Sequence, residues 1–123
     1  AHDVGRAINP QAIAGQLEGG VVMGMGFALS EELKVKEGVV ENADLARYRI
    51  PRVGQSPEVM PIIVEAETSE GPFGAKGVGE ITSIPTAPAI INAIRAATGV
   101  RITSLPATPE KIQAALRESK REG

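Results

Sequence analysis

The stretch NPQAIAGQLEGGVVMGMGFALSEE, residues 9–32, carries the clearest structural signal in this sequence. Asn9 followed by Pro10 is a typical helix start, because asparagine caps the first turn and proline fits the first helical position. The apolar residues that follow predict one helix over residues 10–32. At 100° per residue, one side of this helix is aliphatic, and the opposite side carries Gly15, Gly19 and Gly26.

Each glycine in this helix costs about 1 kcal/mol relative to alanine. We therefore expect a neighbouring backbone or a ligand to pack against the glycine stripe. Gln16 lies within the apolar run, at nearly the same angle as Met23, and is either a polar contact to a ligand or a satisfied core amide. Because the run contains Glu18 and has no flanking basic cluster, it indicates a buried helix rather than a membrane span.

The rest of the chain alternates short extended and helical patterns. We expect a hairpin over residues 33–41 with its turn at Glu37 and Gly38, a helical turn at 44–47 and a strand at 59–67. A helix at 85–97, a strand at 100–105 and a helix at 109–120 complete the order. This order predicts an α+β fold, in which one domain over residues 1–123 has two α/β layers, a small mixed sheet and three helices.

Composition removes several classes of function. The 123 residues are 42% apolar and 23% charged, which is typical of a globular chain long enough to bury its own core. The net charge of -2 argues against a nucleic-acid binder. The absence of cysteine excludes disulfides and thiolate metal ligands, and the one histidine, His2, argues against a histidine-rich zinc site.

The stretch GPFGAKGVGE, residues 71–80, is the best candidate for chemistry. Its glycines let backbone N–H groups approach an oxyanion, a phosphate or the edge of a cofactor. It ends at Glu80, which can act as a general base if it faces a cavity. The spacing of Gly74, Gly77 and Gly79 fits no common phosphate-binding motif. The alternative is a mobile surface loop with a solvated glutamate.

Three stretches in this order, DVGRAINPQAIAGQLEGGVVMGMGFALSEEL, GPFGAKGVGE and PTAPAIINAI, resemble the C-terminal part of the molybdopterin-binding (large) subunit of the xanthine dehydrogenase/aldehyde oxidase family of molybdenum hydroxylases. The resemblance runs from Asp3 to about Ala115 and implies a fragment of a larger subunit. It also implies that Glu80 is the catalytic base, which activates a molybdenum-bound hydroxyl for hydroxylation of an aldehyde or an N-heterocycle. Ile81 and Thr82 depart from the family, in which proline often follows this glutamate.

The same resemblance implies a molybdopterin cofactor in the complete enzyme and none on the isolated chain, which would not turn over substrate alone. The residues that it places against the cofactor are Gln16, Lys76, Gly77, Val78 and Gly79. The implied partners are the remainder of the subunit and iron–sulfur and, in some members, flavin subunits or domains, in the cytoplasm, with no nucleic acid and no membrane. The alternative is a non-catalytic binding or assembly module that keeps the fold without a cofactor.

Overall fold

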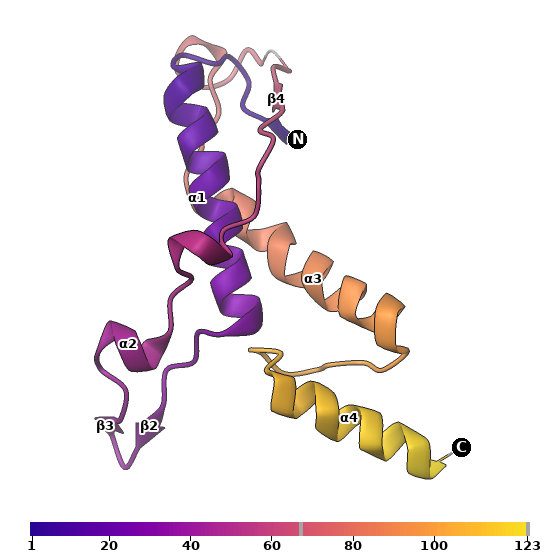
Figure 1. Ribbon diagram of the computed structural model, residues 1–123. Coiled ribbons are helices and arrows are strands. Elements are labelled where there is room, and N and C mark those ends of the chain that lie inside the picture. The colour runs from indigo at the N-terminus through magenta and orange to yellow at the C-terminus, as the bar shows by residue number, and fades with distance from the viewer. Residues whose placement is uncertain (67, 123) are drawn as a thin grey trace.

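The fold was analysed in a computed structural model that describes residues 1–66 and 68–122. Three long helices dominate it: α1 (Pro10–Leu29), α3 (Ser83–Thr98) and α4 (Pro109–Glu122), with a short helix α2 (Leu45–Tyr48) between the first two. Figure 1 shows α1 running through the upper part of the molecule, α3 starting beside its middle and extending away from it, and α4 lying below α3. Together with short strands, these helices confirm the predicted α+β class.

The strands are short and form two separate sheets. β1 (His2–Asp3) pairs in parallel with β4 (Ile63–Val64), and β2 (Val35–Lys36) pairs antiparallel with β3 (Val39–Val40). The predicted hairpin is confirmed, and its turn residues Glu37 and Gly38 have φ angles of 50° and 80°. Positive φ at both positions is typical of the two-residue turns that join the strands of a hairpin.

The helix α1 begins as predicted and ends earlier. The Asn9 side chain accepts a hydrogen bond from the Ala12 amide at 3.0 Å. At the other end, the amides of Ser30 and Glu31 both donate to the Gly26 carbonyl, at 2.9 and 2.8 Å, which closes the last turn. By length and a mean hydropathy of 1.3, α1 could cross a membrane, but here it packs against α3.

Two expected strands differ from the prediction. The strand expected over residues 59–67 is reduced to β4, because only the two residues of β1 pair with it, and Glu67 lies outside the described residues. Residues 100–105 alternate like a strand but form an irregular connection between α3 and α4. This connection is fixed to α1 instead, because the Ala107 amide donates to the Ala28 carbonyl at 2.6 Å.

Little apolar surface is buried within the described residues. The buried apolar residues there are Val4, Leu17, Ala28, Val100 and Ala107. The accessible surface is 8831 Å², whereas a folded monomer of 12.8 kDa exposes about 6,300 Å². Large side chains remain in solvent, among them Val53 (96% exposed), Met60 (82%) and Phe73 (82%). The described residues therefore bury less apolar surface than a folded monomer of this mass ordinarily does.

Candidate functional site

A hollow of about 260 Å³ lies between α1 and the end of the glycine-rich loop. It brings together three of the predicted site residues, Gln16, Gly79 and Glu80, although Gln16 and Glu80 are 64 positions apart in the sequence. Four residues of α1 complete its wall: Gly15, Gly19, Gly20 and Met23. The sequence places Gln16 and Met23 at nearly the same angle on the helix, and both line this hollow.

The wall formed by α1 is largely bare backbone. A Cβ atom added at Gly15 or at Gly19 would meet nothing within 4 Å, so a bound group could approach the helix backbone there. Gly26 does not belong to this open stripe. A Cβ atom at Gly26 would lie 1.9 Å from the Glu31 carboxylate and 2.9 Å from Pro51, so this glycine serves internal packing.

A short 3-10 turn over Glu80–Thr82 positions the carboxylate at the edge of the hollow. The Ser83 hydroxyl donates to the Glu80 carbonyl at 2.6 Å, and the Thr82 hydroxyl donates to the Gln16 carbonyl at 3.3 Å. The Glu80 side chain is exposed, and the turn leads directly into α3. An accessible carboxylate on a fixed turn can accept a proton from a group bound in the hollow.

A second hollow, of about 220 Å³, lies on the other side of Gln16. Its wall is mostly apolar and contains two further predicted residues, Lys76 and Val78. Gln16 lines both hollows and so connects the Glu80 side with the Lys76 side. Gly77, the remaining predicted residue, is exposed, with open space where a Cβ atom would lie.

Lys76 is engaged within the chain through both its backbone and its side chain. Its amide donates to the Val4 carbonyl at 2.9 Å, and its ammonium group forms an ion pair with Asp3. The Lys76 ammonium, followed by the Gly5 and Ala66 amides that donate to the same carboxylate, lowers the pKa of Asp3 to about 2. Lys76 therefore fastens the glycine-rich loop to the N-terminal segment.

Sequence reasoning missed the role of this N-terminal segment. Gly5 has a φ of 60°, and a Cβ atom there would lie 2.3 Å from the Gly74 carbonyl. The Arg6 amide donates to that same carbonyl at 2.9 Å. Only glycine allows the two backbones to approach so closely, and a two-residue strand followed by one glycine gives no periodic signal that would have revealed the contact.

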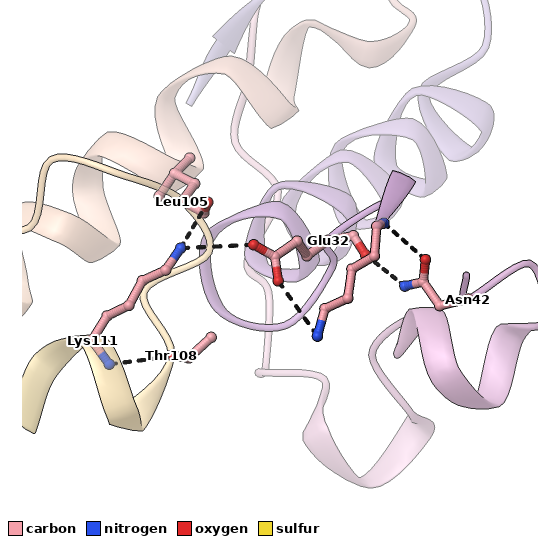
Figure 2. Close-up of polar contacts among 6 residues, drawn as sticks. Glu32, Asn42, Leu105, Thr108 and Lys111 are labelled. Atoms are coloured by element: carbon pink, nitrogen blue, oxygen red, sulfur yellow. Dashed lines mark hydrogen bonds and ion pairs between the residues drawn. The ribbon is translucent and has the colours of Figure 1, made fainter. Parts of the chain in front are cut away.

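The far end of α1 forms a polar junction, which Figure 2 shows. Asn42 is buried, and its side chain donates to the Glu32 carbonyl at 2.7 Å and accepts from the Lys34 amide at 2.8 Å. The Glu32 carboxylate lies 3.9 Å from the ammonium groups of both Lys34 and Lys111. Lys111 also donates to the Leu105 carbonyl at 3.1 Å, so the junction ties α4 to the end of α1.

The polar junction adjoins a hollow of about 580 Å³ that is lined by both cationic and anionic side chains. Glu32 there pairs with Lys34 and Lys111, whereas Arg47 pairs with Asp44, which lies outside the hollow. Within residues 1–66 and 68–122, no three histidine or carboxylate side chains gather in an arrangement that could hold a metal ion. Among the predicted site residues, Glu80 is the carboxylate, and it lines the hollow beside α1.

Comparisons with known proteins show the family to which this chain is similar. A family described as molybdopterin cofactor-binding domain matches residues 1–57. The chain is 42% identical over 113 residues to a xanthine dehydrogenase molybdenum-binding subunit of Escherichia coli O157:H7, covering 90% of this chain and 15% of that protein. It is 44% identical over 116 residues to an aldehyde oxidoreductase of Megalodesulfovibrio gigas, covering 94% of this chain and 12% of that protein.

Solved structures give the same result at the level of the fold. Quinoline 2-oxidoreductase from Pseudomonas putida 86 superposes with a TM-score of 0.86 and 32% identity, over 94% of this chain and 15% of that one. Aldehyde oxidoreductase from Desulfovibrio gigas superposes with a TM-score of 0.84 and 42% identity, over 94% and 12% respectively. The chain thus spans between about an eighth and a seventh of the length of these relatives.

Proposed function

The chain belongs to the molybdopterin cofactor-binding domains of the xanthine dehydrogenase and aldehyde oxidoreductase family, and from this premise we propose that it forms one wall of the cofactor site of a molybdenum hydroxylase, with Glu80 as the catalytic base. One observation supports this proposal above the others. The hollow beside α1 combines an accessible carboxylate, a side-chain amide and bare helix backbone.

The residues of the hollow fit a flat, polar cofactor such as molybdopterin. The open positions beside Gly15 and Gly19 leave room for a ring system against α1. The Gln16 carboxamide can both donate and accept hydrogen bonds at its edge. The hollow of about 260 Å³ is smaller than the roughly 300–1,000 Å³ of complete ligand sites, which supports a site that other parts of the enzyme complete.

When bound, the molybdenum cofactor would supply the transferred oxygen and accept the electrons of the oxidation. The role that we assign to this chain is the movement of one proton. The Glu80 carboxylate would accept the proton of that oxygen, which would make it a better nucleophile toward the substrate carbon. Gln16 and Gly79 would hold the cofactor beside Glu80. The substrate class that we propose is an aldehyde or an N-heterocycle.

We further propose that the complete enzyme includes the remainder of the molybdenum subunit together with iron–sulfur and flavin partners, in the cytoplasm. The exposed apolar surface supports contact with other parts of an assembly, because side chains such as Met60 and Phe73 otherwise remain in water. The open and small hollow also supports our expectation that the isolated chain retains no molybdenum. Elemental analysis of the purified chain tests this expectation directly.

The decisive experiment replaces Glu80 by glutamine in the complete enzyme. Glutamine keeps the shape and can still donate a hydrogen bond, but it does not accept the proton. We expect the rate of enzyme reduction by substrate to fall by about 10²–10⁴ in single turnover, with molybdenum and pterin content unchanged. Glu70→Gln is the matched control, because Glu70 also lies in an exposed position close to the loop.

Two results would contradict the proposal. If Glu80→Gln is reduced at the wild-type rate with full cofactor content, the base lies elsewhere. If the complete protein containing this chain holds no molybdenum at all, the alternative of a non-catalytic assembly module is correct. A loss of rate that Glu70→Gln shares would point to a general disturbance of the loop.

A further inference from the structure

We propose that Gly20 and Thr82 form a positioning contact that sets the distance between Glu80 and α1. This inference rests on the proposed role of Glu80 and deepens it. Thr82 closes the 3-10 turn that Glu80 opens, and Gly20 lies on the face of α1 that meets this turn. Neither residue belongs to the set predicted to contact the cofactor.

The contact is unusually close. A Cβ atom added at Gly20 would lie 1.8 Å from the Thr82 hydroxyl oxygen, 2.9 Å from the Thr82 Cβ and 3.2 Å from the Ser83 amide nitrogen. Gly20 is buried, whereas its neighbour Gly19 faces open space. The turn that carries Glu80 therefore rests directly on the helix backbone at one residue.

A hydrogen bond fixes the same contact from the other side. The Thr82 hydroxyl donates to the Gln16 carbonyl at 3.3 Å, one helical turn before Gly20. The Gln16 side chain lines the hollow in which Glu80 lies. The bond thus links the backbone of Gln16 to the turn that carries Glu80. It fixes the positions of the Gln16 and Glu80 side chains relative to each other across the hollow.

Rotation of the Thr82 side chain would not relieve a substitution at Gly20. Rotation moves the hydroxyl away, but the Thr82 Cβ remains 2.9 Å from the added carbon, and the bond to Gln16 is lost. Ordinary contact begins at 3.4 Å, so the turn itself must move away from α1, by about 0.5 Å if the hydroxyl rotates away and by about 1.6 Å if it does not. A displacement of a reacting group by about 1 Å can lower a rate about 10²-fold.

Gly24, one helical turn further along α1, provides the matched control. A Cβ atom there would lie 2.6 Å from the Thr86 Cβ and 2.8 Å from the Ser83 carbonyl, so it too is a close contact. Its nearest neighbour, however, is a side chain of α3 and not the residue that closes the Glu80 turn. Gly24→Ala disturbs the packing of α1 against α3, and Gly24 does not line the hollow.

The test measures a double-mutant cycle in the complete enzyme, with rates expressed per bound molybdenum. We expect Gly20→Ala to lower kcat about 10²-fold with KM changed less than about threefold. Thr82→Gly, which removes both clashing atoms, should lower kcat only about tenfold and should restore the Gly20→Ala variant to that level. Gly24→Ala presses on Thr86 and on the Ser83 carbonyl but not on Thr82, so it should lower the melting temperature and lower kcat per molybdenum much less than Gly20→Ala does.

A second pair of variants covers the case in which Gly20→Ala does not fold. Thr82→Val replaces the hydroxyl by a methyl group of similar size, so the bond to Gln16 is lost with little change in shape, and we expect a fall in kcat of about tenfold. Thr82→Ser keeps the hydroxyl and should lose less. The melting temperatures of the Gly20 and Thr82 single and double variants give a readout that needs no activity. The loss of melting temperature caused by Gly20→Ala should be smaller in the presence of Thr82→Gly than in its absence.

Parallel measurement of Glu80→Gln separates the two proposals. A slow Glu80→Gln enzyme together with a wild-type kcat for Gly20→Ala overturns this inference alone. Equal losses of kcat per molybdenum in Gly20→Ala and Gly24→Ala also overturn it, because the effect would then be one of helix packing. A wild-type rate for Glu80→Gln overturns the proposed function, and this inference with it.

Discussion

The middle of α1 and its C-terminal end are attached to the rest of the molecule by opposite means. In the middle, Gly20 and Gly24 let α3 and the turn before it approach the helix backbone. At the end, the polar junction uses the side chains of Glu32, Asn42 and Lys111 to bridge separate segments. At the glycines there is no room for an added side chain, whereas the junction is held by the polar groups of its side chains. We therefore expect larger side chains to be damaging in the middle of α1 and the removal of side chains to be damaging at its end.

The strongest effect is expected where atoms are excluded. Gly24→Leu places a branched side chain where even a Cβ atom lies 2.6 Å from Thr86, so we expect a loss of about 3 kcal/mol or more in the free energy of unfolding. Urea unfolding followed by circular dichroism measures it. Gly54→Leu is the control, since a Cβ atom at Gly54 meets nothing within 4 Å. Equal stability of the two variants would show that α1 and α3 do not pack as described.

At the polar junction, removal of atoms should be the damaging change. Asn42→Ala leaves the Glu32 carbonyl and the Lys34 amide without their partner at a half-buried site, which should cost about 1 kcal/mol in the free energy of unfolding. Asn92→Ala, in an exposed position of α3, should have no such cost. If both substitutions are equally mild in urea unfolding, water replaces Asn42 and the junction is not closed.

The open glycines of α1 should behave unlike both of these regions. Gly15→Ala meets nothing within 4 Å, and alanine lowers the entropy of the unfolded chain, so we expect the chain to gain about 0.4–1 kcal/mol in stability. In the complete enzyme, the added methyl group projects into the hollow, and we expect the molybdenum content to fall. A more stable chain with full molybdenum content would show that no cofactor lies against this stripe.

A smaller effect is expected at the third attachment, where the N-terminal segment holds the glycine-rich loop. The pKa of Asp3 is lowered from 3.8 to about 2 in the folded chain, so its contribution to stability is present above pH 4 and is lost as the pH falls toward 2. We expect the urea midpoints of wild type and Asp3→Asn to differ at pH 5 and to converge near pH 2. A constant difference over this range would contradict the ion pair with Lys76.

Local signals in the sequence predicted the elements that depend on few residues. The cap at Asn9 predicted the start of α1, and the glycine after Glu37 predicted the hairpin turn. The strand predicted at residues 100–105 is wrong, because alternation of apolar and polar residues does not show whether a second strand lies nearby to pair with it. The two-residue strand β1 was missed, since its pairing with β4 depends on a contact across about sixty residues.

The candidate site could be predicted only in part for the same reason. The resemblance singled out Gln16 and Glu80, and the fold brings them to one hollow. No spacing in the sequence predicted that Lys76 would be engaged by Asp3 and Val4, or that Gly20 would meet Thr82. Each of these contacts joins segments distant along the chain, and their partners are apparent only once the backbone path is known.

The close approach of Gly5 to the Gly74 carbonyl has a consequence for the order of folding. This contact joins residues about seventy positions apart. The pairing of β1 with β4 and the contact of Gly20 with Thr82 each join residues about sixty positions apart. Closing chain loops of this size costs entropy before any contact compensates it, and chains rich in such contacts fold slowly. We therefore expect the helices to form first from local contacts, and the loop that carries Glu80 to take its shape only when both distant segments have docked.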